Sequence, residues 1–174
     1  MLGPEGNWQG PEDGSITFAT GHDDKFIYFA AHVRDDRVLP EKDALDVLID
    51  SRDPSTRAGD TRLQAGAYRF RFDAPATGKE SKVRVTPLGR GTSLKGVQGV
   101  ARRTNEGYDV ELAVPVTLFN RGKNVDWHSF QLGVVQEDID QEGDKPNEIL
   151  WRGSKDYLKR NTNFGHFLNT KGKP

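Results

Sequence analysis

The sequence predicts an all-β protein, an antiparallel β-sandwich or jelly roll of about ten strands with at most one short helix. Apolar and polar residues alternate with a period of two along most of the chain, and helical periodicity is almost absent. Turn-forming Gly, Pro, Asn and Asp residues separate the alternating segments, as in sandwiches and jelly rolls. The chain has 174 residues, which suits a single domain spanning residues 1–174.

Four strands are expected in the first half of the chain. They are residues 15–20, 25–33, 44–50 and 67–73. The second has apolar residues on both faces at its start, which is typical of a central strand. Residues 51–62 are polar and contain Pro54 and Gly59, so this segment is expected to be a loop.

Six further strands are expected in the second half. They are residues 81–86, 97–104, 108–114, 130–136, 149–151 and 164–168. Asn105, Glu106 and Gly107 lie between two of them and are typical of a hairpin turn. Residues 115–119 begin with Pro115, which suits the first position of a helix, and are expected to form one short helical turn.

Composition argues against several classes of protein. The 25 basic and 26 acidic residues give a formal charge of -1, so we expect no attraction to nucleic acid or to an anionic membrane. The absence of cysteine excludes disulfides, thiolate metal sites and a cysteine nucleophile. The chain starts in what reads as the middle of a loop, without a signal peptide, and we expect a fragment of a larger protein.

No catalytic constellation stands out, so the protein is expected not to be an enzyme. The four histidines lack metal-binding spacing, and no nucleophile elbow surrounds a serine. Some β-sandwich domains bind haem through axial side chains such as Met. Met1 is the only methionine in this sequence, which disfavours haem binding.

Two acidic segments are candidates for metal binding. Asp138, Asp140 and Glu142 alternate before Gly143, as at the start of a calcium loop, although the spacing does not match an EF-hand. The alternative is a solvated acidic connection between strands. The second segment contains Asp35, Asp36, Glu41 and Asp43, and its alternatives are turn formation at a strand end or contact with a metal or ligand.

Arginine and aromatic residues are candidates for ligand contact. Arg69 and Arg71 lie on the opposite face of their strand from its aromatic residues, where they either contact a ligand or solubilise an open sheet. Trp151 follows two apolar residues and is expected in the core. Tyr157 lies in a polar loop, and we expect it to be exposed.

Four segments resemble a family 9 carbohydrate-binding module, of the type attached to xylanases, with a DOMON-like β-sandwich. In order they are DDKFIYFAAHVRDD (residues 23–36), KDALDVLID (42–50), GYDVELAVPVTLF (107–119) with SFQLGVVQEDID (129–140), and ILW with NFGHF (149–167). The resemblance implies bound calcium ions and a pocket for sugar chain ends. It places sugar-contacting positions on Asp46, on Arg69 and near Gln136.

The resemblance has two departures. The family's tryptophans that clamp the sugar correspond here to the stretch from Leu39 to Glu41 and to the stretch from Tyr157 to Lys159. The expected sugar-binding residues are therefore Glu41, Asp46, Arg69, Arg71, Gln136 and Tyr157. The expected calcium ligands are Asp35, Asp138, Asp140 and Glu142.

The leading hypothesis is a non-catalytic carbohydrate-binding domain that targets a larger protein to a polysaccharide or a sugar chain end. That protein would be secreted, periplasmic or on the cell surface. The alternative is a structural or protein-interaction domain without sugar binding, which the missing tryptophans favour.

Overall fold

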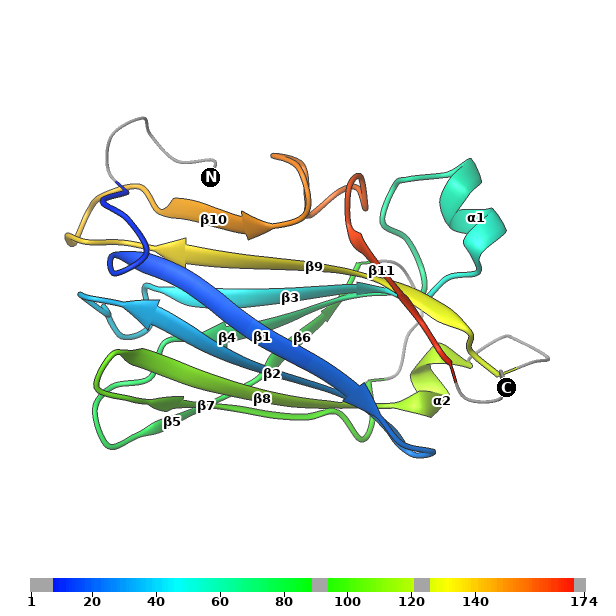
Figure 1. Ribbon diagram of the computed structural model, residues 1–174, viewed down its shortest axis with the longest axis horizontal. Coiled ribbons are helices and arrows are strands. Elements are labelled where there is room, and N and C mark those ends of the chain that lie inside the picture. Colours follow the sequence, from blue (N-terminus) through cyan, green and yellow to red (C-terminus); the bar gives the residue numbers. More distant parts are fainter. Residues whose placement is uncertain (1–7, 89–93, 121–125, 171–174) are drawn as a thin grey trace.

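Two antiparallel sheets pack face to face in the computed structural model, which describes residues 8–88, 94–120 and 126–170 (Figure 1). This part of the chain holds eleven strands and two short helices. The elements are β1 (Gly14–His22), β2 (Phe26–Asp35), β3 (Ala44–Asp50), α1 (Pro54–Gly59), β4 (Ala67–Asp73), β5 (Glu80–Lys82), β6 (Arg84–Pro87), β7 (Gln98–Arg103), β8 (Gly107–Pro115), α2 (Val116–Phe119), β9 (Ser129–Asp138), β10 (Asn147–Trp151) and β11 (Gly165–Leu168). The all-β sandwich expected from the sequence is confirmed.

The first sheet has the strand order β1-β2-β8-β7-β5. The second sheet has the order β10-β9-β3-β4-β6, and β11 also pairs with β9. The long β9 accommodates both partners because β11 pairs with its beginning, at Ser129 to Leu132, and β10 pairs with its end, at Val134 to Asp138. Both helices lie at the same end of the sandwich, at the right in Figure 1.

The core lies between the sheets and is filled by the inward side chains of both. Val33 from β2 and Phe70 and Phe72 from β4 have no measurable exposure to solvent. The alternation expected for β4, with aromatic residues inward and arginines outward, is confirmed. Trp151 packs edge-on against Phe18 with the ring centres 4.7 Å apart, so its expected place against the core is confirmed as well.

A second apolar cluster covers part of the outer face of the second sheet. Leu48 and Val135 point outward from β3 and β9, and Leu63, Tyr157 and Phe164 cover them. These three residues come from the segments between β3 and β4 and between β10 and β11. Every residue of β3 is therefore buried, although its sequence alternates.

The segment expected to be a loop at residues 51–62 contains α1, so the limit of one short helix was wrong. Pro54 begins this helix. Arg57 ties it to the sheet, because one of its guanidinium nitrogens donates to Ser129 Oγ at 2.6 Å. The strand expected at residues 81–86 is also divided, since β5 joins the first sheet and β6 the second.

The expected hairpin turn before Tyr108 is confirmed, and Gly107 explains its tightness. This residue has φ +144°, and an added Cβ would collide with the carbonyl oxygen of Val33 on the neighbouring strand. No helix of the described residues is long and apolar enough to cross a membrane.

Candidate functional site

Four charged side chains form one network on the outer face of the second sheet. Asp46 comes from β3, Arg69 and Arg71 from β4, and Glu137 from β9, and these three strands are neighbours (Figure 1). The register pairs Asp46 with Arg71 on one side and with Val135 on the other. The charges share this face because their neighbours in sequence, such as Leu45 and Phe70, point to the other face of the sheet, into the core. We call these four residues the arginine–carboxylate network.

Asp46 is the centre of the network. Arg69 donates to both of its carboxylate oxygens, with Nε at 2.8 Å and Nη2 at 2.6 Å. Arg71 reaches it with Nη1 at 3.1 Å and donates from Nη2 to Glu137 at 2.6 Å. Asp46 has no exposed side-chain surface, whereas Arg69, Arg71 and Glu137 remain 22%, 18% and 16% exposed. A ligand on this face would therefore meet the outer edges of the guanidinium groups and Glu137, but not Asp46 itself.

The network is electrostatically self-compensating. Burial raises the pKa of Asp46, and the hydrogen bonds and charges of the two arginines act against this rise. Burial alone would lower the pKa of Arg71, but its hydrogen bond to Glu137 and the nearby carboxylates raise it above its ordinary value. Two positive and two negative charges thus lie in contact, and the network carries no net charge.

Tyr157 is not exposed, so that expectation was wrong. Its side chain belongs to the apolar cluster over β3 and only 3% of the residue is exposed. Its hydroxyl donates to Glu148 Oε1 at 3.1 Å, with Glu137 Oε1 at 3.5 Å. The polar neighbours of Tyr157 in sequence hid this packing, because the segment folds back over the sheet. Through its hydroxyl, Tyr157 lies next to Glu137 of the network, but its buried ring offers no surface on which a sugar could stack.

Two further expected sugar-binding residues do not join the network. Gln136 is fully buried and points to the opposite side of β9, where its Nε2 lies 3.5 Å from the carbonyl oxygen of Arg34. The next residue, Glu137, occupies the outer face instead. Glu41 is exposed in the loop before β3, and its backbone N–H donates to the Ala74 carbonyl oxygen at 3.1 Å.

A buried acidic group lies at the end of the sandwich opposite the helices. Asp35 ends β2, Asp43 precedes β3 and Asp138 ends β9, and each offers an oxygen within 4.8 Å of the others. We call them the buried aspartates. They are at most 3% exposed, which does not fit the alternative in which Asp35 and Asp43 only form a solvated turn at a strand end. Backbone N–H groups of Leu39 and Ile139 donate to Asp43 at 2.5 and 2.9 Å.

Burial raises the pKa of all three buried aspartates. The pKa is about 6 for Asp35, about 8 for Asp43 and about 7 for Asp138, and in each case removal from water is the largest cause. Repulsion from the neighbouring aspartates raises the pKa of Asp43 and Asp138 further, whereas Arg103 and a hydrogen bond with Asp43 act against the rise at Asp35. A bound cation would favour the ionised form of all three carboxylates.

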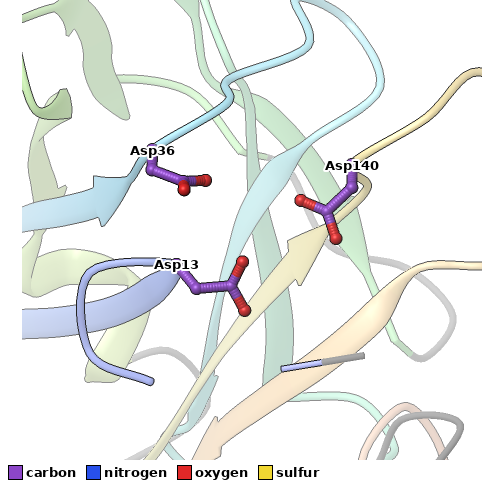
Figure 2. Close-up of side chains that lie close together, drawn as sticks. All are labelled: Asp13, Asp36 and Asp140. Carbon is purple, nitrogen blue, oxygen red and sulfur yellow. The ribbon is translucent and has the colours of Figure 1, made fainter. Parts of the chain in front are cut away.

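A second acidic group lies beside the first. Figure 2 shows the carboxylates of Asp13, Asp36 and Asp140 facing a common space, and each offers an oxygen within 4.8 Å of the others. Asp13 is buried and accepts a hydrogen bond from the Gln9 backbone N–H at 2.6 Å, whereas Asp36 is exposed. We call Asp13, Asp36 and Asp140 the surface aspartates.

The calcium ligands expected from the sequence are distributed between the two groups. Asp35 and Asp138 belong to the buried aspartates, and Asp140 belongs to the surface aspartates. Glu142 is exposed and belongs to neither group among the described residues. The members that sequence reasoning did not assign to calcium are Asp13, Asp36 and Asp43. Asp13 has no distinguishing signal, since it lies in an ordinary turn before β1.

The family model for carbohydrate family 9 binding domain-like proteins matches residues 4–168. The chain belongs to this family. A family 9 carbohydrate binding module from Caldicellulosiruptor kristjanssonii in complex with glucose has a similar structure, with a TM-score of 0.68, 13% identity, and coverage of 92% of this chain and 78% of that chain. Its complex with cellotriose gives a TM-score of 0.68 and 13% identity, with coverage of 92% and 77%. No curated protein matches the sequence significantly.

Within this family 9 domain, the sugar-contacting positions implied by resemblance are only partly brought together. Asp46 and Arg69, two of these positions, lie in direct contact. Glu137 was missed because sequence comparison placed the polar position near Gln136, one residue earlier. Alternation along β9 was the signal that could have found it, since Asp46 pairs with Val135 and the outer face therefore continues at Glu137.

Proposed function

We propose that this family 9 domain binds a neutral carbohydrate on the outer face of the second sheet, at the arginine–carboxylate network. The observation that carries the proposal is the network itself, in which Arg69, Arg71 and Glu137 are held rigidly and remain partly exposed. Planar guanidinium and carboxylate groups make directional, charge-assisted hydrogen bonds of the kind that sugar hydroxyls accept and donate. The similar domain with glucose and cellotriose bound favours a glucose-based ligand.

The charge balance of the network favours a neutral sugar over an acidic one. Arg69 and Arg71 are already compensated by Asp46 and Glu137, and Asp73 adds a further carboxylate at 3.3 Å from Arg71. Asp73 is in turn compensated by Arg84 at 2.5 Å. An anionic sugar would therefore find no arginine without a carboxylate partner in this group, whereas sugar hydroxyls can donate to the carboxylates and accept from the guanidinium groups at the same time.

Binding is expected to rest on hydrogen bonds more than on stacking. The family's two tryptophans are replaced, and Tyr157 turns its ring into the apolar cluster. Hydrogen bonds exchanged with water contribute only about 0.5–1.5 kcal/mol each, so we expect weak affinity for single sugars and stronger binding of oligosaccharides.

Isothermal titration with glucose, cellotriose and xylotriose tests this site. Arg69→Met should weaken oligosaccharide binding at least tenfold, because it removes the partly exposed guanidinium group while keeping a long side chain. Arg62→Met is the matched control, since Arg62 is 68% exposed and pairs with Asp60 elsewhere. Equal binding by wild type and Arg69→Met would contradict the proposal.

A protein-interaction domain is the second candidate function, and one observation favours it. Every guanidinium group of the network already has a carboxylate partner within 3.1 Å. A sugar must therefore compete with existing ion pairs. Absence of binding to all three sugars by the correctly folded wild-type domain would support this second candidate.

We also propose that calcium binds at the buried aspartates. Their site fits the ion, because several buried oxygens have no hydrogen-bond partner: Asp35 Oδ2, Gln136 Oε1, Asp138 Oδ2 and Asn147 Oδ1. Calcium takes six to eight oxygen ligands, from carboxylates and amide carbonyls alike. Gln136 would thus serve the ion and not the sugar. A bound ion would join the ends of β2 and β9 and the start of β3, which are far apart in sequence.

Thermal unfolding with calcium and with EDTA tests the metal proposal. Calcium at 100 times its dissociation constant should stabilise the wild type by about 2.7 kcal/mol. Asp138→Asn should abolish most of this gain, whereas Glu142→Gln should retain it because Glu142 lies outside both acidic groups. Equal calcium responses of wild type and Asp138→Asn would refute this site.

We propose, finally, that the domain is non-catalytic and belongs to a larger extracytoplasmic protein that it targets to polysaccharide. Extracellular modules bind calcium with dissociation constants of about 0.1–1 mM, so a domain stabilised by calcium at the buried aspartates fits a location outside the cytoplasm. Incubation with cellotriose should release no glucose, and fractionation of the native source should place the protein outside the cytoplasm. Measurable hydrolysis, or recovery from the cytoplasm, would contradict the corresponding part of the proposal.

A further inference from the structure

The outer face of the first sheet carries a groove on the opposite side of the molecule from the network. Two hollows of about 410 and 420 Å³ lie there, and they share Ala30 of β2 and Glu111 of β8 among the residues that line them. The first hollow extends over β7 and the second over β1. Together they cross four adjacent strands, and three inter-strand spacings correspond to about 14 Å. The groove is thus long enough for more than one sugar ring.

Small side chains form the floor of the groove. The register places Ala19 of β1 opposite Ala30 of β2, and Ala113 of β8 opposite Tyr28. Alanine is uncommon on an exposed sheet face, where β-branched, aromatic and long polar residues are usual. Because these side chains are short, the taller residues on either side stand above them as walls.

Tyr28 forms an aromatic wall at one side. It is 41% exposed, and it is one of few large apolar residues in the described chain with this much open surface. Its hydroxyl donates to Asp23 Oδ2 at 2.9 Å, and its ring lies 6.0 Å from that of Phe26. These contacts restrict the ring before any ligand arrives, so that binding would cost little side-chain entropy.

Paired charged groups lie beside the alanines on the side away from Tyr28. The register puts His32, Asp109 and Arg102 in one row there, and it puts Glu111 directly opposite Ala30. Arg102 of β7 donates to Glu80 at 2.7 Å and to Glu111 at 3.0 Å. His32 Nδ1 lies 2.7 Å from Asp109 Oδ1. Carboxylates outnumber the arginine here, so a phosphate-bearing or uronic acid chain would be repelled. The groups are nevertheless planar and exposed, and each presents hydrogen-bonding edges to the groove.

We propose that this groove is a second carbohydrate-binding surface, which takes an internal segment of a neutral polysaccharide. A rigid aromatic face opposite planar hydrogen-bonding groups matches the apolar face and hydroxyl rim of a pyranose, and an open groove accepts a chain that continues at both ends. A protein partner fits less well, because a stable interface buries about 800 Å² on each side with several apolar anchors, and Tyr28 is the one exposed large apolar residue described on this face.

The second surface does not depend on the arginine–carboxylate network. The two sites lie on opposite sheets, so both can contact polysaccharide in the same material. Two weak sites on one rigid domain raise the overall affinity for a polymer through effective concentration, without affecting the affinity for a single sugar. The polymer, but not glucose, should therefore bind more tightly than either site alone allows.

Amide chemical shifts of the labelled domain, titrated with cellohexaose and separately with glucose, test the proposal. Cellohexaose should move amides of β2, β7 and β8, and Ala30→Arg should abolish these shifts by filling the groove. Thr77→Arg is the matched control, because it adds the same side chain to an exposed turn outside the groove. Tyr28→Ala, which removes the aromatic wall without filling the groove, should weaken cellohexaose binding at the first sheet at least fivefold.

Arg69→Met separates the two sites. With this substitution, the shifts on the first sheet should persist even if those around β3, β4 and β9 disappear. Shifts confined to the second sheet would overturn the groove proposal and leave the network proposal intact. Unchanged first-sheet binding in folded Ala30→Arg, or saturation of these amides by a co-purified protein and not by cellohexaose, would also overturn it.

Discussion

At the scale of single residues, Asp46 shows how a carboxylate on a solvent-facing side of a sheet becomes fully buried. Two guanidinium groups from the neighbouring strand cover it and take up both of its oxygens. The same contacts that remove it from water also compensate its charge. Asp46 is therefore a positioning residue for Arg69 and Arg71, whose outer edges remain available.

Substitution of Asp46 by Asn tests this role. Asp46→Asn leaves two partly buried arginines with less compensation, and we expect a loss of about 2–4 kcal/mol in the free energy of unfolding, below the upper range for fully buried pairs. Urea unfolding measures the change. The exposed pair of Asp60 and Arg62 supplies the control, because Asp60→Asn should leave the unfolding midpoint unchanged. Equal effects of the two substitutions would contradict the burial argument.

At the scale of elements, the segments that cover β3 decide which surfaces of the second sheet remain open. Leu63, Tyr157 and Phe164 pack over Leu48 and Val135, so one end of the outer face becomes a third layer. Gly133 on β9 makes room for this layer, since an added Cβ would lie 2.8 Å from the Phe164 ring. The sheet is thus apolar under the cover and charged beside it.

Two substitutions in this covering layer separate its packing from its hydrogen bond. Phe164→Ala should cost about 3–5 kcal/mol, because it empties a buried aromatic site. Tyr157→Phe should cost only about 1 kcal/mol, because it removes the bond to Glu148 and keeps the ring in place. Chemical denaturation gives both values. Sugar affinity should be nearly unchanged in Tyr157→Phe, and its complete loss would contradict this expectation.

At the scale of the whole molecule, the two ends of the sandwich differ in chemistry. The helices close one end (Figure 1), and the buried and surface aspartates lie at the strand ends and turns of the other. The strand ends that meet there, at residues 35, 43 and 138, are distant in sequence. Whatever stabilises this end therefore holds both sheets together.

This arrangement predicts a pH dependence that calcium reverses. Without metal, the folded-state pKa values of Asp35, Asp43 and Asp138 are about 6, 8 and 7, above the ordinary value of about 3.9 in the unfolded chain. The folded state then holds more protons from about pH 4, where the unfolded carboxyls ionise, so in EDTA its stability falls as pH rises from there and levels off near pH 8. Calcium requires the ionised carboxylates, and its stabilisation should grow over the same range.

Melting temperatures between pH 5 and pH 8.5, measured in EDTA and in calcium, check this dependence. Arg103 lies near Asp35 and lowers its pKa, and Asp140 raises that of Asp138, so both are part of the charge environment. Asp43→Asn should flatten the decline in EDTA. A melting temperature in EDTA that rises between pH 6 and pH 8 would contradict the prediction.

The expected strands and their buried faces largely agree with the structure, and the reason is local. A pleated strand sends successive side chains to opposite faces, so the alternation in residues 67–73 places Phe70 and Phe72 inside and Arg69 and Arg71 outside. The same rule does not apply to Tyr157. Its neighbours in sequence are polar, and its burial results from the folding of this segment over Leu48, which is distant in sequence. The rule also fails to show that residues 51–62 include a helix anchored by Arg57.

The sequence by itself determined the class of fold and the family, because the first follows from local periodicity and the second from motifs along the strands. Only the tertiary structure decided that Asp13, Asp36 and Asp140 form one group while Asp35, Asp43 and Asp138 form another. It also decided that Gln136 is buried on the opposite side of β9 near the carbonyl oxygen of Arg34, while Glu137 joins the network. The physical reason is that strand ends distant in sequence converge at one end of the sandwich, and a shift of one residue along a strand exchanges its two faces.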